Sequence, residues 1–240
     1  MSGRKRFFVE KINSDNTAVL DGDEFVHART VQRVEEGSEI CLLDGSGKEY
    51  TAIVAKIEKR QLTAHITGYM ESDREPRTPI YLLIGGLKGD KTELVVQKAC
   101  ELGAQKVGVF SSEYCAAYLN ENKIERLKKV AKEAAKQCMR SKAPEIEYFD
   151  DFKSALLSAE NYVNKLFACE FADRSEINLS ALNGSTAIVV GSEGGFSEKE
   201  AELAKDNGFS FIYLGKRILR AETAAISLLA IAAHSLGELE

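Results

Sequence analysis

The fold of this chain is decided by the stretch Thr186-Ala187-Ile188-Val189-Val190-Gly191-Ser192-Glu193-Gly194-Gly195-Phe196-Ser197. It begins as a continuous apolar run of strand length. It ends at Ser197, which together with Glu200 makes the capping pair that starts a helix. A fully apolar strand followed by a helix is typical of a parallel sheet that helices cover on both faces. Such sheets bind ligands at the carboxyl ends of their strands, and here that end carries three glycines within residues 191–195.

The same alternation of apolar runs and helical segments extends over residues 78–240, which we therefore interpret as one α/β domain. The expected strands are residues 80–84, 106–110, 145–148, 165–169, 186–190 and 210–214. Asp90 and Glu93 are expected to cap a helix that ends near Gly103. The last helix, residues 222–236, is apolar nearly all round, so we expect it to be buried in the core or in a subunit interface.

Residues 1–73 differ from the rest of the chain. Three short runs rich in β-branched residues, at 39–43, 50–55 and 61–66, predict strands, and their spacing indicates a small β-barrel. The polar stretch at 71–79 holds two of the three prolines of the chain and is expected to be a linker. The sequence thus predicts a barrel over residues 1–73 and an α/β domain over residues 78–240.

Composition excludes several classes of protein. The 240 residues are 44% hydrophobic and 29% charged, as in an ordinary soluble protein. No apolar tract has the length of a membrane span or a signal peptide, so we expect a cytoplasmic protein. The five cysteines form no Cys-x-x-Cys pair and the three histidines are isolated, so neither disulfides nor a metal site is expected. A net charge of −5 argues against indiscriminate coating of nucleic acid, but it allows a local basic patch.

The glycine loop points to a ligand other than a phosphate. Gly191, Gly194 and Gly195 let the backbone turn sharply and approach a ligand closely. Glu193 would repel a polyphosphate, whereas a ligand with hydroxyls or a positive charge fits better, and a nucleoside that carries a sulfonium has both. A plain turn between strand and helix is the alternative interpretation.

A second loop, Leu214-Gly215-Lys216-Arg217-Ile218-Leu219-Arg220, also follows a strand and precedes a helix. Its three cations cannot all lie on one apolar surface. We expect its backbone and aliphatic side chains to line a pocket while at least one arginine faces an anionic substrate. A solvated turn with salt bridges is the alternative.

Residues 121–142 predict a basic helix with eight Lys or Arg against three Glu. Its cations at i+4 spacing would form one stripe, made of Lys128, Lys132, Lys136 and Arg140. Such a stripe is either a solvated face or an RNA-binding surface. The barrel adds further candidate RNA contacts, Arg4, Arg6, Arg29 and Arg33.

Several of these segments resemble one family. Residues 191–197 and 214–224 look like the two signature loops of the ribosomal RNA small subunit methyltransferase E family. Residues 88–103, 137–146 and 27–33 are similar to its first helix, its central segment and its N-terminal barrel. The resemblance covers the whole chain. Ser192 departs from the proline that the family usually has at this position.

The resemblance implies a PUA-like barrel followed by a SPOUT methyltransferase domain with a C-terminal trefoil knot. It also implies a homodimer that methylates N3 of a uridine in 16S ribosomal RNA with S-adenosylmethionine. The residues expected to contact this cofactor are Gly191, Glu193, Gly194, Gly195, Leu214, Gly215, Ile218 and Leu219. Uridine N3 becomes a nucleophile only when its proton leaves, and a guanidinium stabilises the anion that forms. Arg220 is the first candidate for this role and Arg140 the second.

Three other interpretations remain open from the sequence. The chain could be a related knotted enzyme that methylates a ribose hydroxyl or a tRNA base. It could be an RNA-binding protein without activity, in which the glycine loops are structural. The segment 84–92 also resembles a phosphate loop, but Asp90 separates Gly89 from Lys91, which argues against a nucleotide-dependent enzyme.

Overall fold

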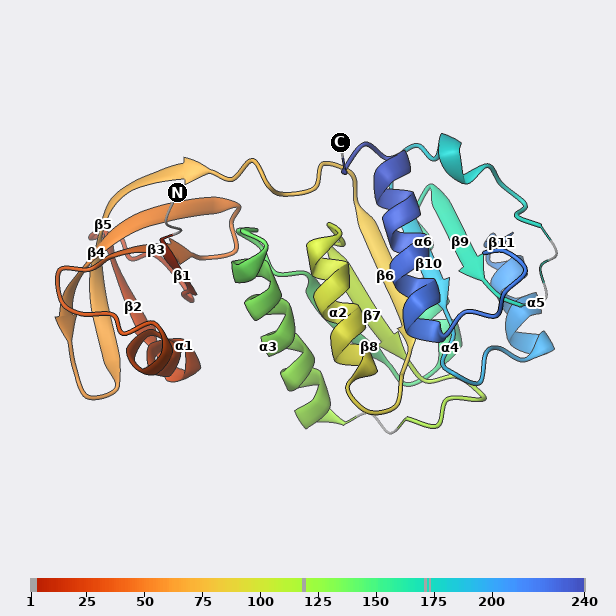
Figure 1. The fold of residues 1–240 in the computed structure, drawn as a ribbon, viewed down its shortest axis with the longest axis horizontal. Helices are drawn as coiled ribbons and strands as arrows, with labels where there is room; N and C mark the ends of the chain where they lie inside the picture. Colours follow the sequence, from red (N-terminus) through yellow and green to blue (C-terminus); the bar gives the residue numbers. More distant parts are fainter. Residues whose placement is uncertain (1–3, 118–119, 171, 173, 240) are drawn as a thin grey trace. The chain divides into compact units, whose positions relative to one another are not determined.

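The computed structural model describes residues 4–117, 120–170, 172 and 174–239 (Figure 1). The chain divides into two compact units, each with its own sheet. The first unit holds the residues up to Glu75 together with Ala135–Ala143, and the second holds Pro76–Ala134 and the residues from Pro144 onward. That Ala135–Ala143 belongs to the first unit was not expected from the sequence.

The first unit is a five-stranded sheet in the order β1-β3-β4-β5-β2, in which only the β1–β3 pair is parallel. Its strands are β1 (Lys5–Phe8), β2 (Thr17–Asp21), β3 (Glu39–Leu43), β4 (Lys48–Ile57) and β5 (Gln61–Glu71). A short helix, α1 (Gly22–Val26), and a π-helical turn, His27–Val31, connect β2 to β3. The sheet curls around one apolar core, to which all five strands contribute. The three strands expected between residues 39 and 66 are confirmed, whereas β1 and β2 were not anticipated.

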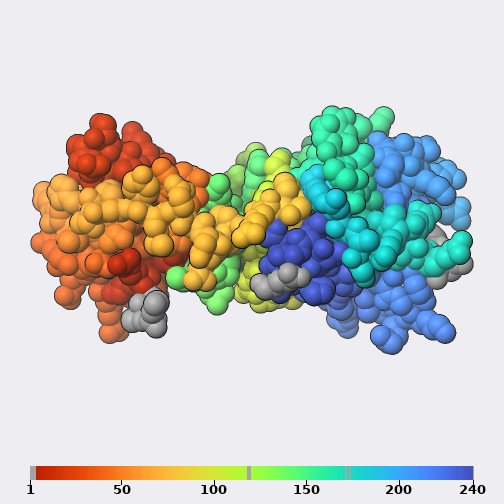
Figure 2. Space-filling view, turned by 90° about the horizontal axis from the view of Figure 1, so that it is seen from above, coloured from red at the N-terminus to blue at the C-terminus, as the bar shows by residue number. Residues whose placement is uncertain are grey.

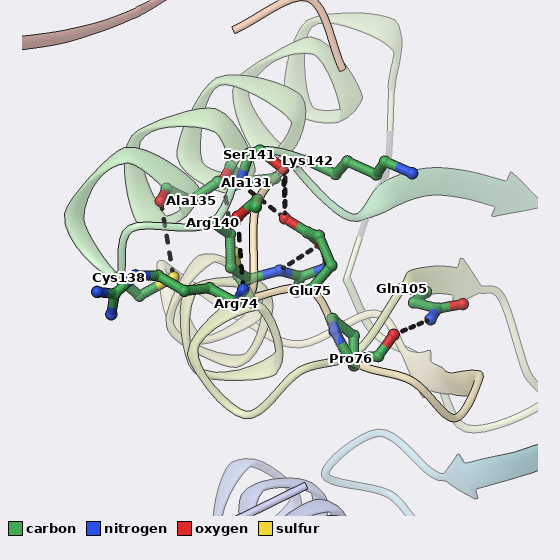
Figure 3. A network of polar contacts seen from close by, with 12 residues as sticks. Arg74, Glu75, Pro76, Gln105, Ala131, Ala135, Cys138, Arg140, Ser141 and Lys142 are labelled. Carbon is green, nitrogen blue, oxygen red and sulfur yellow. Dashed lines mark hydrogen bonds and ion pairs between the residues drawn. The ribbon is translucent and has the colours of Figure 1, made fainter. Parts of the chain in front are cut away.

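Two buried ion pairs hold residues 135–143 in the first unit. Arg6 donates to both carboxylate oxygens of Glu49, at 2.7 and 3.0 Å, and to the main-chain carbonyls of Met139 and Arg140. Glu75 accepts hydrogen bonds from Arg140 Nη2 at 3.1 Å and from Ser141 N at 2.7 Å (Figure 3). Buried charges are stable only when they are paired in this way.

The second unit is built on a six-stranded sheet in the order β11-β9-β10-β6-β7-β8, and every pair in it is parallel. Its strands are β6 (Ile80–Gly85), β7 (Lys106–Phe110), β8 (Glu145–Phe149), β9 (Asn164–Ala168), β10 (Thr186–Val190) and β11 (Ser210–Ile212). All residues of the central strands β6 and β10 are buried. Continuous burial explains why these two strands are apolar at nearly every position. All six strands expected from the sequence are confirmed.

Helices cover both faces of this sheet. On one face, α6 (Ala221–Ser235) packs against α2 (Lys91–Glu101), β10 and β6 (Figure 1). On the other face, α4 (Phe152–Leu157) and α5 (Glu198–Asp206) share a core with the odd-numbered residues of β6 and β10. The remaining helices are α3 (Glu121–Gln137) and a 3₁₀ turn, Leu179–Ala181. None of the helices in the described residues has the length and apolar character to cross a membrane.

Local predictions at helix ends were confirmed in part. Ser197 and Glu200 form the expected reciprocal capping box at the start of α5. Asp90 precedes α2, but its side chain makes no capping hydrogen bond, so this expectation was wrong.

The basic stripe expected along residues 128–140 is not one surface in the structure. Lys128 and Lys132 are exposed, but Lys136 is buried and Arg140 lies beyond the end of α3, where Met139 adopts a left-handed φ of 68°.

Candidate active site

A cavity of about 640 Å³ opens at the carboxyl ends of three strands of the second unit, β9, β10 and β11. Its walls come from the segments that follow these strands, and Lys91 joins them from the start of α2. The lining residues are 168–170, 172, 190–196, 212–221, Lys91 and Ala224. A cavity of this size suits a small-molecule ligand, and its position is the usual ligand site of an open α/β sheet.

The two loops singled out in the sequence, 190–196 and 214–220, meet in this cavity. All the residues expected to contact a cofactor border it: Gly191, Glu193, Gly194, Gly195, Leu214, Gly215, Ile218 and Leu219. The sequence identified them separately, from two loops that residues 197–213 separate. Parallel pairing of β9 with both β10 and β11 brings the two loops together.

Close packing explains the glycines of the first loop. A β-carbon added to Gly194 would lie 2.6 Å from Cβ of Tyr114, and one added to Gly191 would lie 3.0 Å from the ring of Phe196. Gly195 has a left-handed φ of 69°, which other residues rarely adopt. Gly85, at the end of β6, also belongs to this arrangement, because its β-carbon would lie 2.5 Å from Ser192 N. Gly85 was not expected to be a site residue, because it lies in the segment 84–92, which resembles a phosphate loop without matching its spacing.

The second loop presents unpaired cations at the rim of the cavity. Lys216, Arg217 and Arg220 are all exposed, and no residue that the structure describes makes a hydrogen bond or an ion pair with their side chains. Ile218 is 94% exposed, whereas Leu219 is partly buried. Since no carboxylate among the described residues pairs with these three cations, they form a rim that attracts an anion.

An ion-pair cluster joins three segments beside the cavity. Lys91 Nζ lies 3.2 Å from Glu193 Oε1 and 3.6 Å from Glu222 Oε1. Lys88 N donates to the same oxygen of Glu193 at 3.2 Å. Lys91 therefore links the start of α2 to the glycine loop and to the start of α6. Lys91 and Glu222 were not predicted as site residues, and only the position of Lys91 in the glycine-rich segment 84–92 hinted at a role.

The environment of Glu193 makes it a weak base. Burial alone would raise the pKa of this carboxyl group, but hydrogen bonds from its own backbone, from Lys88 and from Lys91 hold the pKa below its ordinary value. Lys88 N and Lys91 Nζ both bind Oε1, and neither of them donates to the second oxygen, Oε2. It can therefore accept a hydrogen bond from a ligand hydroxyl.

The two arginines considered for catalysis lie in different environments. Arg220 is exposed at the cavity rim, directly before α6. Arg140 is only 4% exposed and is paired with Glu75 in the first unit (Figure 3). A guanidinium buried against a carboxylate in this way stabilises the fold, and Arg140 therefore lacks the exposure that Arg220 has.

The candidate RNA contacts divide in the same way. The structure buries Arg6 against Glu49 and Lys136 against Glu24, so neither side chain is open to RNA. The other candidates are exposed: Arg4, Arg29, Arg33, Lys128 and Lys132. Each of the two buried cations has a partner far away in sequence, which a local count of charge does not reveal.

The described residues contain neither a metal-ligand cluster nor a disulfide. Across residues 4–117, 120–170, 172 and 174–239, no group of three His, Cys, Asp or Glu side chains is arranged to hold a metal ion. The five cysteines, all within these ranges, form no disulfide.

Two family models match the chain. The model of the RNA methyltransferase domain matches residues 74–233, and that of the RNA methyltransferase PUA domain matches residues 20–67. Among curated proteins, the ribosomal RNA small subunit methyltransferase E of Mesomycoplasma hyopneumoniae is 32% identical over 227 residues, which cover 93% of this chain and 96% of that protein. The protein of the same name from Bacillus subtilis is 30% identical and is covered to 93%.

Solved structures extend the likeness to the fold. A ribosomal RNA small subunit methyltransferase E from Neisseria gonorrhoeae, bound to S-adenosylmethionine, is 30% identical, with a TM-score of 0.86 and 98% of each chain covered. A methyltransferase from Legionella pneumophila, in complex with the same cofactor, is 27% identical, with a TM-score of 0.88, covering 97% of this chain and 98% of the other. The chain therefore belongs to the ribosomal RNA small subunit methyltransferase E family.

Proposed function

We propose that this protein is an S-adenosylmethionine-dependent methyltransferase of the SPOUT class that methylates N3 of a uridine in 16S ribosomal RNA. The observation that carries the proposal is the cavity, because it joins both glycine-containing loops and has a rim of unpaired cations. The solved relatives bound to S-adenosylmethionine support the choice of cofactor. We place the reaction in the cytoplasm.

The residues around the cavity fit this cofactor. A β-carbon at Gly194 would collide with Tyr114, and one at Gly191 would be in tight contact with the ring of Phe196. The absence of side chains at both positions leaves the loop backbone as the wall that a ligand meets. Glu193 Oε2 is available to ribose hydroxyls, and its charge favours a cationic ligand. Gly215 and Leu219 complete the opposite wall. When bound, S-adenosylmethionine supplies an electrophilic methyl group.

Arg220 supplies the charge that the acceptor base needs. Uridine N3 attacks only after it has lost its proton, and the negative charge then spreads to the two flanking carbonyl oxygens. An exposed guanidinium at the cavity rim can stabilise this charge as it develops. The lowered pKa of Glu193 makes it a poor acceptor for the N3 proton, so we assign the proton to solvent. In-line positioning of N3 against the methyl group completes the reaction.

RNA binding is assigned to the exposed cations of both units. We retain Arg4, Arg29, Arg33, Lys128 and Lys132 as phosphate contacts and exclude Arg6 and Lys136. The match to a PUA domain described for RNA methyltransferases supports this role for the first unit. Phosphate contacts of this kind add affinity without reading sequence.

The family resemblance further implies a C-terminal trefoil knot and a homodimer with sites at the subunit interface, and we propose both. Ile231 of α6 is 39% exposed and Leu94 of α2 is 40% exposed, although both helices lie against the core of the unit. Part of the C-terminal segment, dark blue in Figure 2, is open on the surface in that view. Aliphatic side chains left open on packed helices are available for a second subunit.

Mass spectrometry of ribosomal RNA nucleosides tests the proposal. Cells that lack the protein should lose 3-methyluridine from small-subunit RNA, and the wild-type gene should restore it. Loss of a different methylated nucleoside would indicate a related enzyme with another target atom. Calorimetry with S-adenosylmethionine in the presence of a chelator should show binding, and no binding would favour an RNA-binding protein without activity.

A further inference from the structure

Ile218 has the most exposed large hydrophobic side chain of the residues that the structure describes, with 94% of its surface open. Single exposed aliphatic residues are common and need no explanation by themselves. Ile218 differs from the others because it borders the cavity and lies within a loop that carries Lys216, Arg217 and Arg220. An apolar tip among unpaired cations fits a partner that is both anionic and apolar.

RNA has this combination of properties, since its phosphates are anionic and its stacked bases are apolar. Among the described residues, no carboxylate pairs with the three cations of the loop, so they are available to phosphates. A base in a helix or a stacked strand cannot reach a cavity in a protein. An enzyme that modifies such a base has to take it out of the stack, which costs free energy.

The loop joins β11 to α6, so both of its ends continue into regular elements. Gly215 adopts a left-handed φ of 95° after β11, and Arg220 has an extended backbone directly before α6. The two aliphatic residues between these ends differ in burial, because Leu219 is partly buried and Ile218 is not. Leu219 can therefore line the cofactor pocket while the Ile218 side chain extends outward.

We propose that Ile218 is a wedge that enters the base stack of the RNA beside the acceptor uridine and keeps this base turned into the cavity. The inference rests on the proposed function. Apolar side chains act in this way in other nucleic-acid-binding proteins, where they fill the gap between separated bases. Lys216 and Arg217 would hold the phosphates on either side of the gap.

Single-turnover methylation on two matched RNAs tests the wedge, once the methylated uridine has been mapped. One RNA carries the natural neighbours of the uridine, and the other has abasic nucleotides on both sides, so that no stack has to be opened. With saturating RNA and cofactor, Ile218→Ala should slow methylation of the natural RNA by about tenfold or more and that of the abasic RNA by less than about twofold. Ile218→Leu should retain most of the rate.

Val163→Ala is the matched control, because Val163 is 71% exposed in the same unit and does not border the cavity. It should leave both rates unchanged. Equal slowing of Ile218→Ala on both RNAs, or unchanged rates on both, would overturn the wedge. A loss of the dimer in light scattering of Ile218→Ala would also overturn it, by assigning Ile218 to a contact between subunits. If the wild-type protein methylates neither RNA, the proposed function itself fails.

Discussion

Gly194 and Tyr114 are in such close contact that a β-carbon on Gly194 would lie 2.6 Å from Cβ of Tyr114 and 2.7 Å from its main-chain oxygen. Ser192 Oγ also lies 3.3 Å from this oxygen. The glycine loop after β10 is therefore placed against the backbone of the segment that follows β7. The shape of the cofactor wall depends on this contact as well as on the loop itself.

Gly194→Ala should weaken the binding of S-adenosylmethionine. The added methyl group meets main-chain atoms that cannot rotate away, so the loop has to move. Overpacking of this kind typically costs about 1–3 kcal/mol, which corresponds to roughly five- to 150-fold in affinity. The φ of Gly194 is not left-handed, so the effect comes from lack of space and not from backbone strain.

Calorimetry measures this affinity, and thermal unfolding shows whether the variant is folded. Gly68→Ala is the control, because no heavy atom lies within 4 Å of a β-carbon at this position and its φ is ordinary. Wild-type affinity in a folded Gly194→Ala protein would place the pocket elsewhere.

Glu49→Gln should destabilise the protein. The side chains of Arg6 and Glu49 are only 5% and 17% exposed, and removing one charge of a buried pair typically costs about 3–5 kcal/mol. Denaturant unfolding measures the change. Glu71→Gln, which alters a side chain that is 72% exposed in a long ion pair with Lys48, should leave stability nearly unchanged. Similar losses in the two variants would contradict the importance of the buried pair.

The same pair should make stability depend on pH. The hydrogen bond from Arg6 is the main cause that lowers the pKa of Glu49 below its ordinary value of 4.5, and burial opposes it. A carboxyl group with a lowered pKa in the folded state adds stability above its unfolded pKa and loses it as pH falls through the folded value. The wild-type protein should therefore lose more stability than Glu49→Gln when the pH is lowered below 4.5. If stability falls equally with decreasing pH in the two proteins, the attribution of this pH dependence to Glu49 is contradicted.

Ile231→Glu should convert the proposed dimer to a monomer. Ile231 is 39% exposed on α6, and a carboxylate in a closed apolar interface would lose its hydration. Light scattering at micromolar concentration measures the mass. Leu157→Glu is the control, since Leu157 is 46% exposed on α4, which lies on the other face of the sheet. A monomeric wild-type protein would remove the basis of this prediction.

The central part of the fold could be predicted because its signals are local. The buried strands β6 and β10 are apolar at nearly every position, with Thr186 as the polar residue of β10, and Ser197 and Glu200 cap the helix that follows β10. β1, Lys5-Arg6-Phe7-Phe8, could not be recognised in this way. It is a short edge strand that begins with two cations, and it pairs in parallel with β3, more than 30 residues further along the chain.

The ion pairs of the buried cations could not be predicted either, because they too depend on contacts between segments that are far apart in sequence. The i+4 spacing placed Lys128, Lys132, Lys136 and Arg140 on one stripe, but the sequence does not show that Glu24 and Glu75 bind the last two. Nor does it show that Lys91 links Glu193 and Glu222. Ion pairs between segments far apart in sequence depend on the tertiary fold, so only the structure could separate the exposed cations from the buried ones.

Arg220→Ala should reduce turnover far more than it weakens cofactor binding. We expect Arg220 to act on the uridylate, an anion that exists only as N3 loses its proton. Removing an interaction that is confined to the transition state lowers the chemical rate with little change in ground-state affinity. The loss of one such donor commonly lowers the catalytic rate on the order of a hundredfold or more. Lys132→Ala should instead weaken RNA binding and reduce its salt dependence, because Lys132 is an exposed cation on α3.

Single-turnover methylation with saturating RNA separates the two effects. Under these conditions Lys132→Ala should react at the wild-type rate, while Arg220→Ala stays slow and Arg220→Lys recovers part of the rate, since it restores the charge without the planar fork. If Arg220→Ala reaches the wild-type rate once RNA is bound, Arg220 only shapes the turn into α6. Lys216 and Arg217, the other unpaired cations of the rim, would then be the groups that stabilise the uridylate, because Arg140 is already committed to Glu75.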